Sequence, residues 1–81
     1  MFKKFKEKRR AKLESKAEYY ERKRVAYRKI CDGFNQVVKT IDEAGVEMHL
    51  NRLIIEYRKL ELYYDDRHQR VLEKMVREGF N

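Results

Sequence analysis

The feature of this sequence that most constrains its fold is a series of positions spaced alternately four and three residues apart. In the first half of the chain the series comprises Leu13, Ala17, Tyr20, Arg24, Tyr27, Cys31, Phe34, Val38 and Ile41. Arg24 is its one charged member. This spacing is typical of a seam, the line of residues along which an α-helix packs lengthwise on another helix. The chain has no proline and is rich in Glu, Lys, Arg and Leu, so we expect helix nearly throughout.

A second seam is predicted in the other half of the chain. It comprises Val46, Leu50, Leu53, Tyr57, Leu60 and Tyr64. Beyond Arg67 the pattern resumes at Val71 or shifts to His68, Leu72 and Met75. Such a shift is a stutter in a heptad pattern, not the end of a helix.

Gly45 separates the two seams and predicts the turn between the helices. A glycine followed by an apolar residue is the usual way for a helix to end in a left-handed conformation. We therefore predict one domain with a basic arm over residues 1–12, a first helix over 13–44, and a turn and second helix over 45–81. A short connection makes the helices antiparallel, so residue i should lie near residue 91 − i. This register pairs Tyr27 with Tyr64 and Phe34 with Tyr57, and it leaves residues 1–9 without an intramolecular partner.

Gly33 is the weak point of the first helix. A glycine inside a helix costs about 1 kcal/mol relative to alanine. The seam nevertheless passes through this region in phase, which predicts one continuous helix over about residues 6–44. The alternative is a break at Gly33, which would give three helices.

Several apolar residues lie off both seams, and a two-helix hairpin is too thin to bury them. Leu, Ile, Val and Phe together make up only 20 of the 81 residues, so a single copy has little material for a core. We expect a second copy, forming a homodimeric bundle, or another protein to complete the fold. The residues predicted to contact this partner are Ile54, Ile55, Leu62 and Tyr63.

Positive charge is concentrated at the N-terminus. Residues 1–30 carry a net charge of +9, whereas residues 31–81 carry −2. Such a cluster is typical of an arm that contacts phosphates, an anionic membrane or an acidic protein surface. The arm residues predicted to contact a partner are Phe2, Lys3, Lys4, Phe5, Lys6, Lys8, Arg9, Arg10 and Lys12. The plain alternative is a solvated tail.

Catalytic chemistry is not indicated by any motif. The sequence has no glycine-rich phosphate loop and no credible Ser/His/Asp or Cys/His arrangement. Glu61, Asp65 and His68 share one helical face, but the opposing helix offers Arg22, Lys23 and Arg24, so we interpret them as ion-paired surface residues and not as a metal site. We predict a protein without enzyme activity, cofactor or metal. The lone Cys31 and the lack of a long apolar run favour the cytoplasm and predict no transmembrane segment.

Two function hypotheses follow. The first is a small helical interaction module that regulates, inhibits or scaffolds a macromolecular partner, with its basic arm on an acidic surface. Its size and composition are those of an accessory or virus-encoded regulator. The alternative is a sequence-nonspecific nucleic-acid-binding protein that uses residues 1–30. The segment Glu7-Lys8-Arg9-Arg10 resembles the basic region of dimeric leucine-zipper and helix-loop-helix transcription factors. The leucine repeat and the base-reading asparagine of the zipper family are missing, and the turn predicted at Gly45 is too short for the helix-loop-helix fold. Binding to a membrane surface is the least favoured hypothesis.

Overall fold

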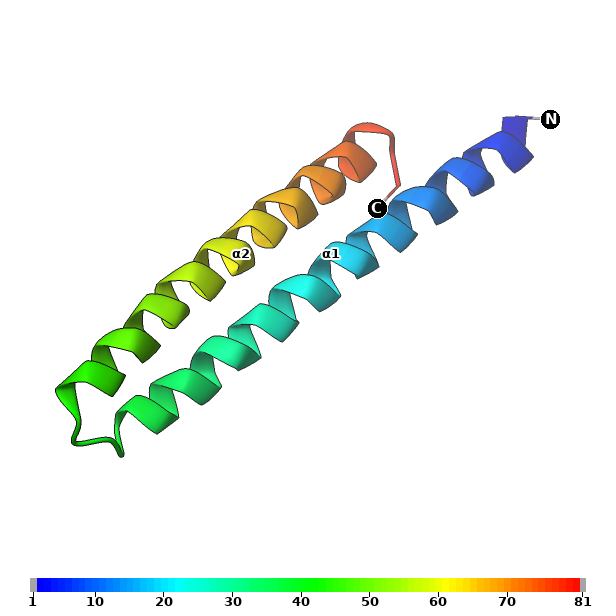
Figure 1. The fold of residues 1–81 in the computed structure, drawn as a ribbon. Helices are drawn as coiled ribbons and strands as arrows, with labels where there is room; N and C mark the ends of the chain where they lie inside the picture. The colour runs from blue at the N-terminus through cyan, green and yellow to red at the C-terminus, as the bar shows by residue number, and fades with distance from the viewer. Residues whose placement is uncertain (1, 81) are drawn as a thin grey trace.

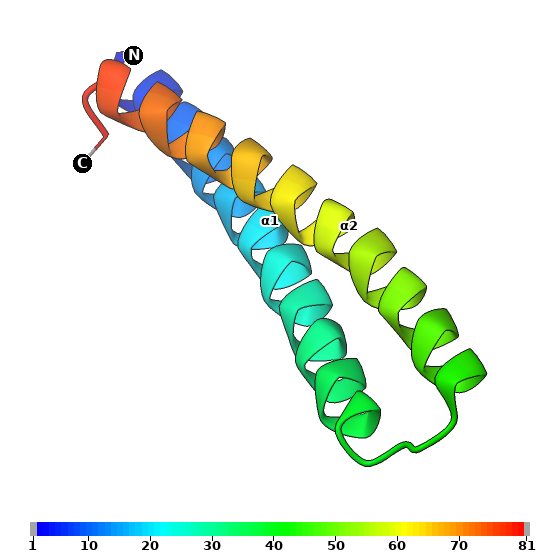
Figure 2. The same cartoon turned by 90° about the vertical axis from the view of Figure 1, so that its left-hand side faces the viewer.

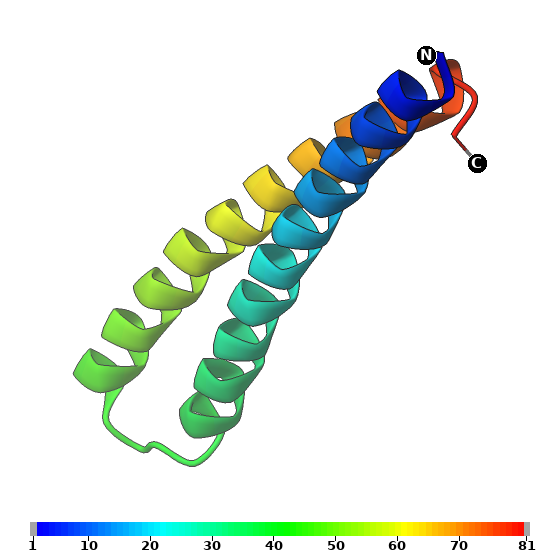
Figure 3. The same ribbon diagram turned by 90° about the vertical axis from the view of Figure 1, so that its right-hand side faces the viewer.

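The protein is a helical hairpin. The computed structural model describes residues 2–80, apart from the side chain of Phe2. Two helices, α1 (Phe2–Val38) and α2 (Ala44–Arg77), run antiparallel and form a rod of 64 × 14 × 14 Å (Figure 1). The side views show that the helices cross rather than run strictly parallel (Figure 2 and Figure 3). The predicted all-α antiparallel hairpin is confirmed. Because α1 passes through Gly33 without a break, the three-helix alternative is wrong.

The connection between the helices spans residues 39–43, earlier than predicted. Thr40 ends α1: its backbone N–H donates to the carbonyl of Val37 at 3.0 Å, and its hydroxyl donates to the same oxygen at 2.8 Å. These bonds satisfy a carbonyl that the helix end leaves free. Glu43 then adopts an extended conformation (φ −90°, ψ 114°) as the N-cap of α2. Gly45 lies in the first turn of α2 without a positive φ, so the prediction that it forms a left-handed helix end is wrong.

The left-handed glycine lies instead at the far end of α2. Gly79 has a φ of 81°. Its N–H donates to the carbonyl of Val76 at 3.0 Å, and the N–H of Phe80 donates to that of Met75 at 2.8 Å. This pair of bonds is the Schellman motif. It turns the chain back toward α1 at the open end of the rod, the end opposite the loop (Figure 1).

The seam of α1 is as predicted. All nine predicted positions are buried or half-buried, and among the residues whose side chains are described only Leu13, Ala17 and Cys31 are buried. Cys31 is fully buried, and its thiol contacts the backbone oxygen of Ile54 at 3.7 Å. The core is therefore a single narrow line of contacts between two helices.

The seam of α2 differs from the prediction by a rotation of one residue in its middle. The buried or half-buried positions with unbroken four and three spacing are Leu50, Ile54, Tyr57, Glu61, Tyr64, His68, Val71 and Met75. Of the predicted positions, Leu53 is half-buried like Ile54, whereas Val46 and Leu60 are 40% and 38% exposed and Arg67 is also exposed. The stutter predicted near Arg67 is thus absent. This orientation places Glu61 in the seam, and it keeps Val71 and Met75 in phase with α1.

Aromatic rings form a ladder along the middle of the seam. The predicted neighbours are confirmed, with ring centroids 5.6 Å apart for Tyr27 and Tyr64 and 5.8 Å apart for Phe34 and Tyr57. The ladder is continuous because Tyr57 also stacks on Tyr27 at 6.0 Å and Tyr64 also meets Tyr20 at 6.3 Å. Each ring of α2 therefore lies between two rings of α1, and a strict rule of 91 − i describes only half of the contacts.

Candidate functional site

The whole excess of positive charge lies in the half of the rod near the open end. Residues 2–20 and 67–80, which make up this half, contain 12 Lys and Arg against five Asp and Glu. Residues 21–66, toward the loop, contain nine of each. The fold creates this asymmetry because it brings the basic end of α2 alongside the basic start of α1. The molecule is therefore a rod with one cationic end and one neutral end.

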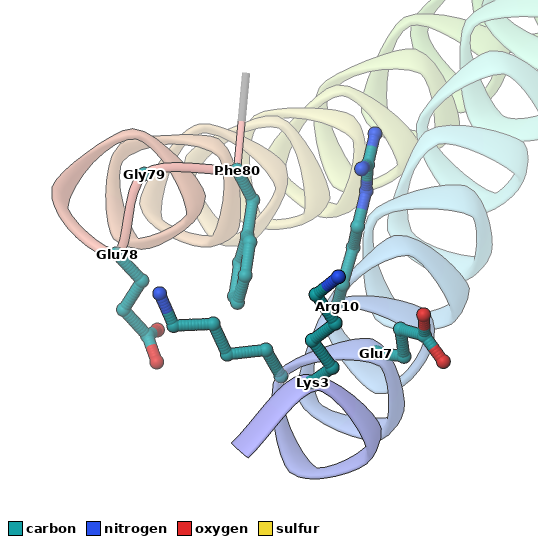
Figure 4. Close-up of a pocket in the computed structure, with 7 residues that line it drawn as sticks. Lys3, Glu7, Arg10, Glu78, Gly79 and Phe80 are labelled. Carbon is teal, nitrogen blue, oxygen red and sulfur yellow. The ribbon is translucent and has the colours of Figure 1, made fainter. Parts of the chain in front are cut away.

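The basic arm continues α1 as a helix beyond the last turn of α2. The seam spacing extends into it as Lys3, Lys6 and Arg10. The tail after α2 folds over these positions. An open groove of about 450 Å³ lies between the tail and α1, and it is lined by Lys3, Lys6, Glu7, Arg10, Glu78, Gly79 and Phe80. Figure 4 shows the ring of Phe80 pointing into the space between the two chain ends, with Arg10 on one side and Glu78 on the other.

The expectation that residues 1–9 lack an intramolecular partner is wrong for Arg9. Its Nε donates to Oε1 of Glu78 at 2.9 Å, and its Nη2 donates to Oε2 at 3.4 Å. This hydrogen-bonded ion pair lowers the pKa of the Glu78 carboxyl and raises the pKa of the Arg9 guanidinium. Glu78 is the C-cap of α2, so the end of that helix sets its position beside Arg9. The arm is thus tied to the hairpin at its base.

The other predicted arm residues are on the surface. Phe5 is 73% exposed, and the remaining lysines of the arm are exposed as well, namely Lys4, Lys8 and Lys12. The predicted contribution of the Phe2 side chain lies outside the part of the chain that the structure describes. Phe5 and these lysines therefore present an apolar ring and several cations to a partner on one short segment of α1.

The four residues predicted to contact a partner from α2 are not on one surface. Ile54 lies in the seam, half-buried, and is therefore not part of a free surface. Ile55 and Leu62 are 55% and 59% exposed on one flank of the seam. Tyr63, 50% exposed, lies on the opposite flank, because it precedes the seam residue Tyr64 whereas the other two follow seam residues.

Two further exposed residues extend the flank of Ile55 and Leu62. Met48 and Val76 are 64% and 61% exposed, and with Ile55 and Leu62 they occupy positions 48, 55, 62 and 76 of a seven-residue repeat. Leu72, 36% exposed, lies on the same flank. We call these five residues the aliphatic stripe. Met48 and Val76 were not predicted as contact residues, although their heptad spacing with Ile55 and Leu62 is a signal visible in the sequence.

A cationic groove crosses both helices near the open end, on the flank opposite the aliphatic stripe. It is an open groove of about 190 Å³ lined by Leu13, Lys16, Tyr20, Arg67, Arg70, Val71 and Lys74. The predicted basic contact surfaces were the arm and, in the nucleic-acid hypothesis, residues 1–30, so the three cations of α2 were missed. Their spacing of three and four residues places them on one helix face and was the available signal.

The polar groups of the seam are incompletely paired. Nε of Arg24, Oε1 of Glu61 and Nδ1 of His68 are buried without a hydrogen-bond partner. Nε of Arg24 lies 3.7 Å from Oδ1 of Asp65, and Oε1 of Glu61 lies 3.9 Å from Nε of Arg58. The triad of Glu61, Asp65 and His68 is thus divided between the seam and its edge. Within residues 2–80 no three His, Cys, Asp or Glu side chains are grouped so that they could hold a metal ion.

The seam residue Tyr64 is closely surrounded by other tyrosines. Burial raises the pKa of its phenol, and the neighbouring hydroxyls of Tyr19, Tyr27 and Tyr63 raise it further, while Lys23 lowers it. The rings of Tyr19 and Tyr63 meet those of Tyr20 and Tyr64 edge-on, at 5.5 and 5.1 Å. Two half-exposed tyrosines therefore lie beside the aromatic ladder, on the same flank as the cationic groove.

Comparison with known proteins gives no relative. No protein-family model matches the chain, and searches of curated proteins and of solved structures return no match. No helix within residues 2–80 has the length and apolar character needed to cross a membrane.

Proposed function

We propose that the protein is a small, non-enzymatic helical interaction module that regulates, inhibits or scaffolds a macromolecular partner. The aliphatic stripe on α2 is the observation that carries this proposal. Four of its five side chains are more than half exposed, whereas the hairpin itself buries only three residues among those with described side chains. An apolar line of this kind on a thin rod is typical of an interaction surface.

The stripe fits a helical partner. Met48 and Val76 are 28 residues apart, which corresponds to about 42 Å along an α-helix. The seven-residue repeat is apolar at four of its five positions, with Gln69 at the other. This spacing favours a partner helix laid alongside α2, because it keeps a second seam in phase. A second copy of the chain is the simplest partner, since every copy carries the stripe and a two-fold arrangement would bury both at once.

The basic arm supplies the second contact of the module. Lys4, Lys8 and Lys12 are exposed on α1, and they adjoin Phe5, whose ring is 73% exposed. This arrangement supports contact with an acidic surface on the partner, in which the cations select the charge and the ring adds buried apolar area. The free thiol of Cys31 is consistent with a reducing compartment such as the cytoplasm.

Measurement of the mass in solution tests the proposal. We expect the parent chain to sediment as a dimer, and Ile55→Asp to shift it to the monomer while helicity is retained. Ile30→Asp is the matched control, because Ile30 is an exposed isoleucine of α1, away from the stripe. A parent chain that remains monomeric at high concentration, or a control that dissociates as readily as Ile55→Asp, would contradict assembly through the stripe.

A further inference from the structure

The cationic groove is a second surface, separate from the aliphatic stripe. Lys16 enters it from α1, and Arg67, Arg70 and Lys74 enter it from α2. Tyr20 and Val71 are half-buried and contribute to its apolar lining. Four cations from two helices therefore surround one depression that is apolar only in part.

Three of these cations form no ion pair with a carboxylate of the described residues. Arg70 lies 3.0 Å from Asp66. Among the described residues no carboxylate lies within ion-pairing distance of Lys16, Arg67 or Lys74. Like charges gathered in this way repel each other and are destabilising unless an anion lies between them. The groove is therefore suited to an anionic ligand.

Aromatic side chains lie at the end of the groove nearer the loop. Tyr19 and Tyr63 are 52% and 50% exposed. Nζ of Lys23 lies 5.7 Å from the ring centroid of Tyr19, and the guanidinium of Arg67 lies 5.2 Å from that of Tyr63. Arg67 thus belongs both to the groove and to an aromatic contact. The edge-on contacts of Tyr19 with Tyr20 and of Tyr63 with Tyr64 hold both exposed rings against the aromatic ladder.

We propose that this groove, together with Tyr19 and Tyr63, binds single-stranded nucleic acid without reading its sequence. A cationic groove that follows the phosphates, combined with aromatic faces on which bases stack, is the general arrangement for such binding. Lys16 and the cations of α2 contact phosphates, and the two tyrosine rings stack on bases. Neither contact distinguishes one base from another, because every base has an aromatic face.

The shape of the site favours a single strand over other polyanions. The groove is small, about 190 Å³, and lies between two helices, so it is suited to one narrow chain of phosphates and not to a broad surface. On α2, Arg70 and Lys74 are one helical turn apart, which spaces their side chains about 6 Å along the rod. An acidic protein surface or an anionic membrane would use the cations, but neither uses exposed tyrosine rings as stacking faces. The site is independent of the helical partner, because the aliphatic stripe lies on the other flank of α2.

Fluorescence anisotropy with a labelled 20-nucleotide deoxythymidine strand tests the proposal. We expect binding to weaken at least about tenfold in the triple variant Lys16→Gln, Arg67→Gln, Lys74→Gln. The slope of log K against log salt should become less negative by about 2, since each phosphate contact with a single strand contributes about 0.7. The matched control is Lys29→Gln, Lys39→Gln, Arg52→Gln, which removes the same charge from the neutral half. It should bind within about threefold of the parent. Equal losses in the two triple variants would overturn the proposal, because the effect would then be one of net charge.

The stacking contact is tested separately at Tyr63. Tyr63→Phe keeps the aromatic face and should bind like the parent, whereas Tyr63→Leu should lose at least about fivefold, since one stacked base contributes about 1–3 kcal/mol. Tyr63 is half-exposed, so both variants should retain the helicity of the parent. Equal binding by the Tyr63→Phe and Tyr63→Leu variants would overturn the stacking role. The proposal as a whole would be overturned if polyglutamate or phosphatidylserine vesicles of equal charge bound as tightly as the oligonucleotide.

Discussion

The seam position of Glu61 leads to a prediction of unusual sign: replacing this charged residue by leucine should stabilise the hairpin. The side chain of Glu61 is only 13% exposed, and its Oε1 is buried without a hydrogen-bond partner. An unsatisfied buried polar group costs about 1–3 kcal/mol. Burying a leucine in the same place contributes about 1.5–3 kcal/mol, less the part that the unfolded chain already buries.

The contact that Glu61→Leu removes is weak. Arg58 Nε lies 3.9 Å from Oε1 of Glu61, and the arginine side chain is 51% exposed, so the ion pair contributes at most about 1 kcal/mol. The balance is a stabilisation of about 2 kcal/mol. For a domain of this size, 1 kcal/mol corresponds to about 4–8 °C, so the melting temperature should rise by about 8–16 °C.

Thermal unfolding followed by circular dichroism measures this change. The melts should be recorded at two protein concentrations, because self-association would make the melting temperature depend on concentration. Glu56→Leu is the matched control: Glu56 is 67% exposed and pairs only with exposed Lys59, so its replacement should alter stability by no more than about 0.5 kcal/mol. A melting temperature for Glu61→Leu at or below that of the parent would refute the assignment of Glu61 to the seam.

Three further predictions test the fold and the open end. Ile54→Ala should destabilise the protein by at least about 1 kcal/mol more than Leu60→Ala in urea unfolding, since only the former creates a gap in the seam; equal losses would restore the predicted seam. Gly33→Ala should stabilise by about 0.5–1 kcal/mol in the same assay, because a Cβ at this helical position meets no atom within 4 Å apart from its chain neighbours and the surrounding helix backbone; a loss would indicate that Gly33 relieves a strain. Because the pKa of Glu78 is lowered in the folded state, its pairing with Arg9 stabilises the protein above the ordinary carboxyl pKa of about 4.3, and that contribution is lost as the pH falls through the folded value. An NMR titration of the Phe80 ring should report this loss, and Glu78→Gln should abolish the response.

The fold was largely predictable because apolar spacing alone defines one face of α1. The rotation of α2 was not, since Leu60 and Glu61 differ by one position and the ordinary preference for apolar residues selects Leu60. Tyr57 and Tyr64 belong to both candidate seams and could not decide between them. Whether Leu60 or Glu61 faces α1 depends on which rotation of α2 also brings Val71 and Met75 to face α1. Only the packed pair of helices reveals this. The turn was predicted at Gly45 because glycine is a common helix end. In the structure the hydrogen bonds of Thr40 to the carbonyl of Val37 end α1 instead.

The contact surfaces were predictable only where they are local in sequence. The basic arm is a run of neighbouring residues, and its charge is evident from composition. The cationic groove joins Lys16 to residues more than 50 positions away, so its existence depends on the register of the hairpin. The ion pair between Arg9 and Glu78 likewise depends on the register, because it joins α1 to the C-cap of α2 across 69 positions of the chain. Residues 54, 55, 62 and 63 looked equivalent because all are apolar, but their positions around α2 place them on three different sides.

The distance along the chain between contacting residues grows steadily from the loop to the open end. The Cys31 contact with Ile54 closes 23 residues, whereas the Arg9 pair with Glu78 closes 69. Closing a chain segment that is three times longer costs about 1 kcal/mol more in conformational entropy. Contacts between the helices should therefore form from the loop toward the open end, and they should break in the reverse order. Amide hydrogen exchange should accordingly be slowest around Cys31 and fastest toward the chain ends. The cations of the open end therefore lie on the part of the molecule that unfolds first. An anionic strand bound across both helices would hold the two helix ends together and oppose this unfolding.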